Sequence, residues 1–336
     1  MSRNLAYRLA VLMMAAVFLL AGAAGSARAE ENPEEPAPEQ TVQTETEDSD
    51  EDLFTIAWMS DTQGYCAAHP EIFDQMVEWI VENREEQHIR YVVLTGDIVN
   101  EPRNDRQWAR AEHALLPLKG VLPFFAVAGN HDIAGVSREY KRFANLMETL
   151  GCSDWDTFGG MEENWRRRYD LVTIGDTDYI FMGAGYTFNR YDAEWMNSLL
   201  EQYPDRTAII LIHWYLNADG KPGDGDGTKL YKNVVSTHEQ VKYVLCGHRH
   251  HVFHLEQAFD YDRDGETDNS VWVIMGDYGA VGDSWEGYIN LVTFDPGRGE
   301  IRCSSYSPLK GYGDERPELG IDSYTLPLNT YTRTKE

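Results

Sequence analysis

The feature that most constrains this chain is a series of short apolar runs that each stop at a glycine or a polar side chain. The runs are too short for helices and are typical of buried strands. They occupy residues 53–60, 91–94, 124–128, 208–212 and 241–245. The segments that follow them are Asp61-Thr62-Gln63, Gly96-Asp97, Gly129-Asn130-His131-Asp132, His213 and Gly247-His248-Arg249-His250. Ligands of open α/β sheets bind at the carboxyl ends of the strands, so we expect these segments to converge.

Among these segments, Gly129-Asn130-His131-Asp132 carries the most chemistry. An amide, an imidazole and a carboxylate follow one another directly after an apolar run. Three polar side chains in succession suit a binding site better than a core. We expect Gly129 to let the chain turn into that site.

The spacing of the other residues predicts how the strands are connected. In the first half, helices at about 71–87 and from a cap at Asn104 or Asp105 alternate with the strands, which is typical of a parallel α/β unit. The second half is richer in strands, and the residues after about 312 give no firm signal. The elements expected there are a hairpin of 171–174 and 179–184, a helix over 192–202 capped by Asp192, a loop at 217–228, and strands at 271–275, 288–294 and 301–306.

The N-terminal residues are predicted to lie outside the folded domain. A positively charged start, an apolar run over 9–24 and the sequence Ala27-Arg28-Ala29 indicate a secretory signal peptide. A retained N-terminal anchor is the alternative, which the shortness of the apolar run disfavours. The following acidic segment has no basic residue and cannot bury enough apolar surface to fold. The predicted organisation is signal peptide 1–29, disordered spacer 30–52, folded domain 53–312 and tail 313–336, in a secreted or extracytoplasmic protein without membrane contact after signal removal.

The charge distribution restricts the partners of the folded part. Of the net charge of −27, +3 belongs to residues 1–29, −11 to residues 30–52 and −19 to residues 53–336. Nucleic acids and anionic membranes require a basic surface, so neither is an expected partner. A phosphate-bearing substrate is still compatible with this charge if metal cations supply the local positive charge. The sequence does not indicate the oligomeric state.

The cysteines do not define a disulfide framework. Cys66, Cys152, Cys246 and Cys303 are few for an exported chain of this length. Two disulfides in three alternative pairings and a set of free thiols are all compatible with the sequence.

The order of the polar segments resembles that of the calcineurin-like metallophosphoesterase superfamily over roughly residues 53–308. The motifs of that family are Asp-x-His, Gly-Asp, Gly-Asn-His-Asp/Glu, a lone His and Gly-His-x-His. Each has a counterpart here in the same order. A single motif is a weak signal, but the ordered set is specific. The resemblance implies an α/β fold, a four-layer α/β/β/α sandwich of two mixed β-sheets flanked by helices, with a dinuclear metal site at the strand C-terminal ends.

The resemblance also implies a role for each residue of the motifs. The ligands of the first metal ion would be Asp61, Asp97 and His250. Those of the second would be Asn130, His213 and His248, with Asp97 as the bridge. His131 would act beside the metals as a catalytic group, and Asp132 would orient its ring. The donor types agree with this, because an anionic bridge reduces the repulsion between two cations while imidazoles and an amide leave the ions electrophilic.

One position departs from the family pattern. Gln63 stands where most members have a histidine, and an amide oxygen is a harder and weaker ligand than an imidazole. We expect Gln63 to bind the first metal, the alternative being a hydrogen bond to a metal-bound water. The Asp-x-Gln form occurs in a sub-branch of the family, so it does not imply inactivity. It leaves the identity of the metals open among manganese, iron and zinc.

The function implied by the resemblance is hydrolysis of a small phosphoester through a metal-bridging hydroxide, by an exported metal-dependent phosphoric ester hydrolase. Two other functions are compatible with the residues. Gln63 allows a homologue that binds metal or phosphate without catalysis, and the same chemistry cuts nucleic acids in nucleases. The acidic folded part disfavours the nuclease. The sequence does not distinguish a monoester, diester, nucleotide or pyrophosphate substrate.

Several weaker signals each have a functional and an ordinary structural interpretation. The sequence Asp260-Tyr-Asp262-Arg-Asp264-Gly265 resembles the start of a calcium loop, but Val271 stands where a glutamate is required, so an acidic turn is expected. His251 and His254 are expected to be structural. Arg249 is compatible with a contact to a substrate phosphate or with an ion pair behind the ligands. Asp277, after another predicted strand, is expected to support the site from outside the ligand set.

Overall fold

The computed structural model describes residues 52–134, 139–279, 285–313, 316 and 323–333. The predicted signal peptide and all but the last residue of the predicted spacer lie outside these ranges. Within them, no helix combines the length and the apolar character that crossing a bilayer requires.

The first sheet contains the three strands predicted from the apolar runs of the N-terminal half and four strands from the C-terminal part of the chain. They are β1 (Phe54–Met59), β2 (Ile89–Leu94), β3 (Phe124–Ala126), β11 (Ile289–Asp295), β12 (Glu300–Ser307), β13 (Tyr312–Gly313) and β14 (Tyr324–Pro327). Their order is β13-β12-β11-β1-β2-β3, and β14 pairs with β12. β1, β2 and β3 are parallel, as the alternation of strands and helices predicts. β11 is antiparallel to β1, so the sheet is mixed.

The second sheet is formed by the central part of the chain. Its strands are β4 (Phe158–Glu162), β5 (Arg167–Ile174), β6 (Thr177–Ala184), β7 (Thr207–Ile212), β8 (Val241–Cys246), β9 (Val252–Phe259) and β10 (Asn269–Gly276). They lie in the order β4-β5-β6-β7-β8-β10-β9. β5 and β6 form the predicted antiparallel hairpin. β6, β7, β8 and β10 are parallel, so their carboxyl ends lie at one edge.

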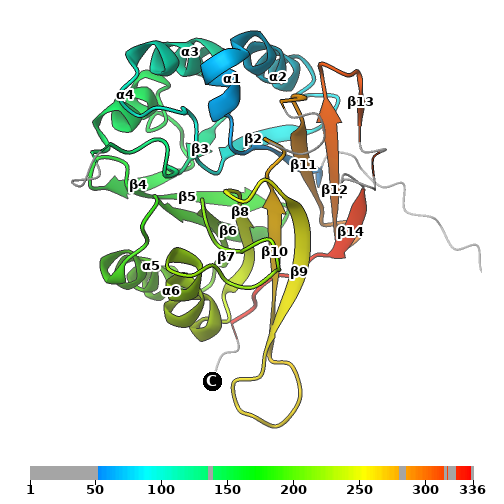
Figure 1. Ribbon diagram of the computed structural model, residues 1–336. Helices are drawn as coiled ribbons and strands as arrows, with labels where there is room; N and C mark the ends of the chain where they lie inside the picture. The colour runs from blue at the N-terminus through cyan, green and yellow to red at the C-terminus, as the bar shows by residue number, and fades with distance from the viewer. Residues whose placement is uncertain (1–51, 135–138, 280–284, 314–315, 317–322, 334–336) are drawn as a thin grey trace, which may run out of the picture. The chain divides into compact units, whose positions relative to one another are not determined.

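Helices cover the outer face of each sheet. They are α1 (Gln63–Ala68), α2 (Pro70–Glu82), α3 (Asp105–Leu115), α4 (Lys141–Thr149), α5 (Arg190–Gln202) and α6 (Asp226–Asn233). Figure 1 shows α1 to α4 over the first sheet and α5 and α6 over the second, with the two sheets packed face to face between them. This is the predicted four-layer α/β/β/α sandwich.

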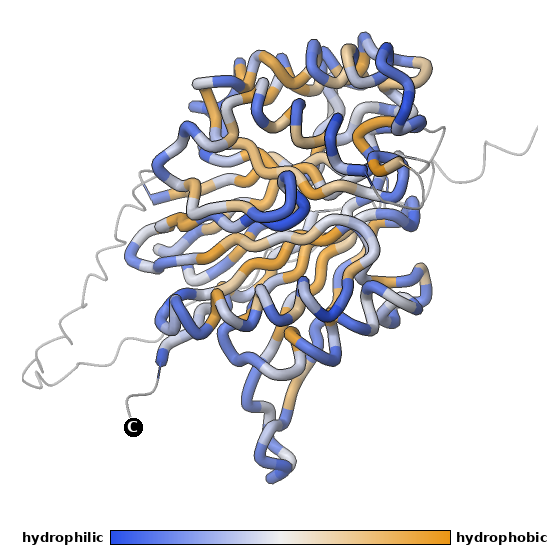
Figure 2. Tube along the Cα trace, turned by 90° about the vertical axis from the view of Figure 1, so that its left-hand side faces the viewer, coloured by the Kyte–Doolittle hydropathy of each residue, from blue (hydrophilic) through white to orange (hydrophobic). Residues whose placement is uncertain are grey.

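The alternation of side chains along the strands accounts for the layers. In β1, Ile56 and Trp58 belong to the apolar core between the two sheets, whereas Ala57 and Met59 pack beneath the helices. Successive side chains of a strand point to opposite faces, so a strand that is apolar throughout must be covered on both sides. Figure 2 shows the hydrophobic residues concentrated in the central layers and hydrophilic residues on the outer helices.

Some helix boundaries differ from the predictions. α2 ends at Glu82, because Asn83 follows as the cap and its side chain donates to the carbonyl of Trp79 at 2.8 Å. The predicted cap of α5 at Asp192 is wrong, since the cap is Asn189. Asp192 lies in the first turn and accepts a hydrogen bond from the Asn189 amide at 2.8 Å, which completes a capping box.

Several regions without a predicted regular element contain one, among them α1, α4 and β4. The predicted loop 217–228 includes the first turn of α6, and the segment after about 312 contributes β14, which pairs antiparallel with β12. The four cysteines are all buried and free, so the disulfide alternatives are wrong and the free-thiol alternative is confirmed.

Candidate metal centre

The predicted ligands follow strands whose ends meet at one edge of the two sheets. Neighbouring ends are joined through the backbone: the Asp61 amide donates to the Gly96 carbonyl at 3.1 Å, and the Gly247 amide donates to the His213 carbonyl at 2.9 Å. The two sheets are joined as well, because Nδ1 of His213, after β7, lies 2.8 Å from the carbonyl of Thr95, after β2. The structure therefore brings the segments together as the sequence predicts.

One group of donors, here called the histidine cluster, consists of Asp97, Asn130, His213 and His248. His213 Nε2 lies 3.1 Å from Asn130 Oδ1, 3.0 Å from His248 Nδ1 and 3.4 Å from Asp97 Oδ2. Ligand atoms of Asp97, His213 and His248 all lie within 4.8 Å of one another. This is the set of residues expected around the second metal ion.

A second group, here called the acidic cluster, consists of Asp61, His250 and Asp277, whose ligand atoms also lie within 4.8 Å of one another. Asp61 Oδ2 accepts a hydrogen bond from the His248 amide at 3.0 Å, which joins the two clusters. Asp277 accepts from the His250 amide at 2.6 Å and lies 3.4 Å from its Nδ1, so it contacts both the backbone and the ring of His250.

Two oxygens at this edge test whether the residues fit a metal ion. Asp61 Oδ1 and Gln63 Oε1 are buried and have no hydrogen-bond partner among the described residues. Leaving buried acceptors unsatisfied costs about 1–3 kcal/mol each, and a bound cation is one way to satisfy such oxygens. Carboxylate and amide oxygens beside imidazole nitrogens also form a donor set suited to divalent transition metals. The donor types fit a metal ion, and Gln63 contributes a buried oxygen without a described hydrogen-bond partner.

The electrostatics of the clusters favour a bound positive charge. Burial, followed by the carboxylate of Asp277, raises the pKa of Asp61 well above its ordinary value. Burial would lower the pKa of His213, but the carboxylates of Asp97 and Asp61 and the carbonyl of Thr95 together raise that pKa to about 10. Burial and the neighbouring His213 lower the pKa of His248 to about 3, so its imidazole stays neutral. A bound metal ion would replace the protons that the raised pKa values of Asp61 and His213 favour.

Four of the candidate ligands have positive φ angles, which the sequence did not predict. Asp61, Asp97, His248 and His250 have φ angles of 55°, 52°, 77° and 48°. Positive φ is uncommon in residues other than glycine and costs about 1–3 kcal/mol each where the structure enforces it. Such conformations concentrate at functional sites, and here four candidate metal ligands have a positive φ angle.

The glycines of the motifs are required because neighbouring side chains lie too close to leave room for a Cβ atom. A Cβ at Gly129 would collide with the carboxylate of Asp97, and one at Gly247 would collide with Ser60 and Asp61. Gly129 therefore leaves room for a ligand, in addition to the turning role expected from the sequence. Ser60 also donates a hydrogen bond to Asp61.

The predicted interaction between Asp132 and the ring of His131 is wrong. Asp132 Oδ1 accepts from the amides of Ile98 and Val99 at 2.8 and 3.0 Å, and its Oδ2 accepts from the amide of Gly129 at 2.7 Å. The acceptor beside His131 Nδ1 is instead the carbonyl of Asn100, at 2.8 Å. Asp132 thus ties the segment after β2 to the segment after β3.

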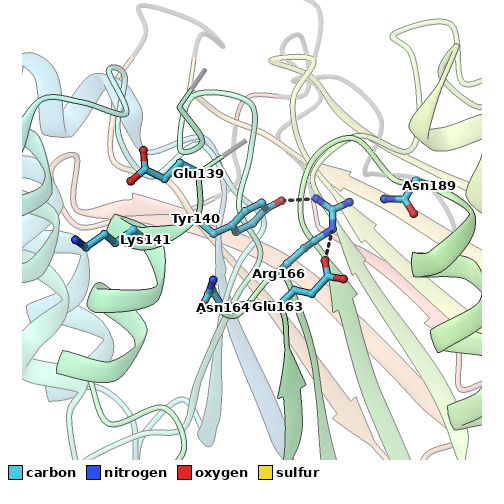
Figure 3. A pocket seen from close by; sticks show the side chains of 7 residues that line it. All are labelled: Glu139, Tyr140, Lys141, Glu163, Asn164, Arg166 and Asn189. Carbon is cyan, nitrogen blue, oxygen red and sulfur yellow. Dashed lines mark hydrogen bonds and ion pairs between the residues drawn. The ribbon is translucent and has the colours of Figure 1, made fainter. Parts of the chain in front are cut away.

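Two further polar features lie apart from the clusters. Asp260, Asp262 and Asp268 gather at the turn between β9 and β10, where Asp260 accepts from the amides of Arg263 and Gly265 at 2.6 and 3.0 Å. This is the expected acidic turn. A cavity of about 460 Å³, shown in Figure 3, is lined by Glu139, Tyr140, Lys141, Glu163, Asn164, Arg166 and Asn189. It contains none of the candidate ligands.

Comparison with known proteins agrees with the fold and the motifs. Residues 54–252 match the family model described as calcineurin-like phosphoesterase, and the chain belongs to this family. It is 34% identical over 289 residues to the uncharacterized protein YvnB of Bacillus subtilis (strain 168), covering 85% of this chain and 22% of that protein. It is 30% identical over 84 residues to the uncharacterized metallophosphoesterase YkoQ of the same organism, covering 25% and 31%. The chain thus spans less than a third of the length of either relative.

Solved structures show the same fold at low sequence identity. A dimetal phosphatase from Danio rerio superposes with a TM-score of 0.55 at 11% identity, over 82% of this chain and 99% of that one. GAP50, the anchor in the inner membrane complex of Plasmodium, superposes with a TM-score of 0.53 at 14% identity, over 84% and 90%.

Proposed function

We propose that this chain is an exported, dinuclear metal-dependent phosphoesterase acting on a small phosphoester. The observation that carries the proposal is the pair of adjoining clusters, with the unpartnered oxygens of Asp61 and Gln63 beside them. One ion would be held by Asp61, Gln63, Asp97 and His250. The other would be held by Asp97, Asn130, His213 and His248.

Two bound ions would supply an activated water nucleophile and neutralise charge on the phosphoryl oxygens. The protein's own contribution to the reaction is proton transfer by His131. Its Nδ1 faces the Asn100 carbonyl, which only accepts, so Nδ1 must carry the hydrogen. Nε2 is then the ring nitrogen left to exchange a proton with the substrate. When Nε2 is protonated as well, the ring can give that proton to the leaving oxygen of the ester and remain as the Nδ1–H tautomer.

The test separates metal binding from proton transfer. Asp97→Ala should lose both metal and activity, because the variant lacks a carboxylate shared by both ions. His131→Ala should keep its metal and lose turnover by about 10²–10⁴-fold, the usual contribution of a general acid. Metal content by mass spectrometry and hydrolysis of p-nitrophenyl phosphate measure the two effects. Equal metal loss in both variants would contradict the role given to His131.

Export is proposed from the N-terminal sequence. The positive start, apolar run and Ala27-Arg28-Ala29 support cleavage after residue 29. Mass spectrometry of the mature protein, recovered from outside the cytoplasm, should give an N-terminus at Glu30. A full-length N-terminus in a membrane fraction would instead support the retained anchor.

A metal- or phosphate-binding protein without catalysis is the second candidate, and the amide at Gln63 favours it over the nuclease. Titration of the metal-free protein with manganese, zinc or iron in the presence of aryl phosphates distinguishes it from the enzyme. Metal binding without turnover with any of the three would support this candidate.

A further inference from the structure

Arg249 lies between the two histidines of the last motif and has an unusual set of contacts. Its guanidinium carbon is 4.8 Å from the ring centroid of Trp214, and its Nη2 donates to Asn217 Oδ1 at 2.8 Å. Trp214 Nε1 lies 3.4 Å from the same amide oxygen. These contacts fix the position of the guanidinium without neutralising its charge, because neither an aromatic ring nor an amide is anionic.

The ring beneath Arg249 belongs to the wall of the site. The centroid of Trp214 is 4.9 Å from that of His248, and Tyr186 stacks on Trp214 at 6.4 Å with an interplanar angle of 19°. Trp214 is therefore in contact with Arg249, His248 and Tyr186, so it supports its surroundings. The Tyr186 amide donates to the Ala128 carbonyl at 2.8 Å, directly before Gly129.

The wall is held in place by a strained residue. Thr187 has a φ of 69°, which is exceptional for a β-branched side chain. Its amide donates to Asp226 Oδ2 at 2.6 Å, and its carbonyl accepts from Arg166 Nη2 at 3.1 Å. Arg166 also donates to Tyr140 in the cavity of Figure 3. Strain of this kind persists where the surroundings over-determine the conformation, typically at functional sites.

Two buried arginines near the start of β5 are, in contrast, neutralised. Arg166 pairs with buried Asp192 at 2.7 Å, and Arg168 pairs with buried Asp170 at 2.7 Å. Arg249 is exposed, and its described contacts include no carboxylate. In a folded part with a net charge of −19, a fixed and exposed guanidinium at the border of the histidine cluster is suited to an incoming anion.

We propose that Arg249 binds a non-bridging oxygen of the substrate's phosphoryl group and makes the site prefer phosphomonoesters to diesters. This inference rests on the proposed function. A monoester presents three non-bridging oxygens and a diester two, so a monoester would keep one for Arg249 if cations held by the clusters engaged the other two. A monoester also carries nearly two negative charges near neutral pH, since its second pKa is about 6. Trp214 and Asn217 are positioning residues for the guanidinium.

The experiment compares Arg249→Gln and Arg249→Lys with a matched control. Arg190 is also exposed and lies 5.1 Å from the ring of Tyr191, but it belongs to α5, away from the clusters. The full chain is loaded with manganese, and inorganic phosphate binding is measured by calorimetry. Hydrolysis of p-nitrophenyl phosphate and of bis(p-nitrophenyl) phosphate is measured in parallel. Metal content is checked in every variant.

Arg249→Gln should weaken phosphate binding and lower kcat/KM for the monoester by about 10- to 100-fold, the range for a charged hydrogen bond. Diester hydrolysis and metal content should be unchanged. Arg249→Lys should recover part of the loss, because it keeps the charge but not the planar fork. Arg190→Gln should match the wild type. Asn217→Ala should reduce monoester hydrolysis through KM, and should have no further effect in the Arg249→Gln background.

The experiment distinguishes a failure of the Arg249 inference from a failure of the proposed phosphoesterase function. Equal losses for monoester and diester, or no loss for either, would overturn the inference while leaving the phosphoesterase intact. A wild type that cleaves neither ester but binds phosphate in an Arg249-dependent manner would overturn the proposed catalysis and retain the phosphate contact. A wild type that neither binds phosphate nor cleaves an ester would overturn both.

Discussion

At the scale of single residues, Asp132 shows how a motif residue can have a role other than the one its neighbour suggests. Its carboxylate accepts three backbone hydrogen bonds from Ile98, Val99 and Gly129. These amides flank Asp97 and the segment that carries Asn130. The structure therefore assigns Asp132 to holding the ligand-bearing backbone together.

Asp132→Asn should destabilise the protein, because an amide NH₂ in place of one oxygen faces backbone donors that it cannot accept from. The expected loss is about 1–3 kcal/mol in the free energy of unfolding, measured by urea denaturation of the metal-free protein. Asp176→Asn, at an exposed hairpin turn, is the control. Unchanged stability together with a shifted pH profile of hydrolysis would contradict this role and would support the role of Asp132 in orienting the ring of His131.

The sequence predicted which ligand residues gather at one edge of the sheets, but not all of their partners. Donor types and their place after apolar runs are local properties, so Asp97, His213 and His248 could be read directly. The acceptor of His131 could not, because it is the backbone carbonyl of Asn100, which every residue possesses. The positive φ angles of the ligands likewise leave no signal in side-chain chemistry.

At the scale of elements, the start of β5 contains a buried ion pair that links several strands and loops. Arg168 and Asp170 are paired at 2.7 Å, and Arg168 also donates to the carbonyls of Phe124 and Cys152 at 2.7 and 3.2 Å. Phe124 begins β3, the strand that leads to Asn130. The pair therefore anchors the second sheet to a strand of the first.

Arg168→Met should lower the free energy of unfolding by about 3–5 kcal/mol, because it leaves the carboxylate of Asp170 buried without its partner. The double variant Arg168→Met/Asp170→Asn should be less destabilised than the sum of the single changes. Urea denaturation measures both, with exposed Arg190→Met as the control. Additive effects would show that the two side chains act independently.

Elements were predictable where apolar periodicity was strong and local. β1, β2, β3, β7 and β8 each coincide with one of the apolar runs. α6 does not, because it begins inside a segment rich in glycine and aspartate that is typical of a loop. β14 is short and contains a proline, and its register depends on β12, which lies earlier in the chain. Long-range pairing of this kind is not visible in local composition.

At the scale of the whole molecule, metal and fold should be thermodynamically linked. The buried carboxylates of Asp61, Asp97 and Asp277 lie in adjoining clusters, and Asp97 and Asp277 both raise the pKa of Asp61. Bound cations would relieve this repulsion only in the folded state. Ligands that bind only the folded state stabilise it by about 2.7 kcal/mol at a hundredfold excess over Kd.

Removal of metal with a chelator should therefore lower the Tm of the wild type, and readdition of manganese should restore it. Differential scanning calorimetry measures the change. Asp97→Ala should show no shift on chelation, since it is expected to bind no metal. A wild-type Tm that does not respond to chelation would contradict the linkage between the clusters and an ion.

The burial of the four free cysteines affects how the protein reacts with oxidants. All four thiols are buried, and burial raises the pKa of each above its ordinary value. Reaction with oxidants requires an accessible thiolate, so the folded chain presents little for an oxidant or a disulfide-exchange enzyme to attack. If exported as proposed, it could mature without the oxidative folding machinery, and its integrity would be indifferent to the redox state of its surroundings.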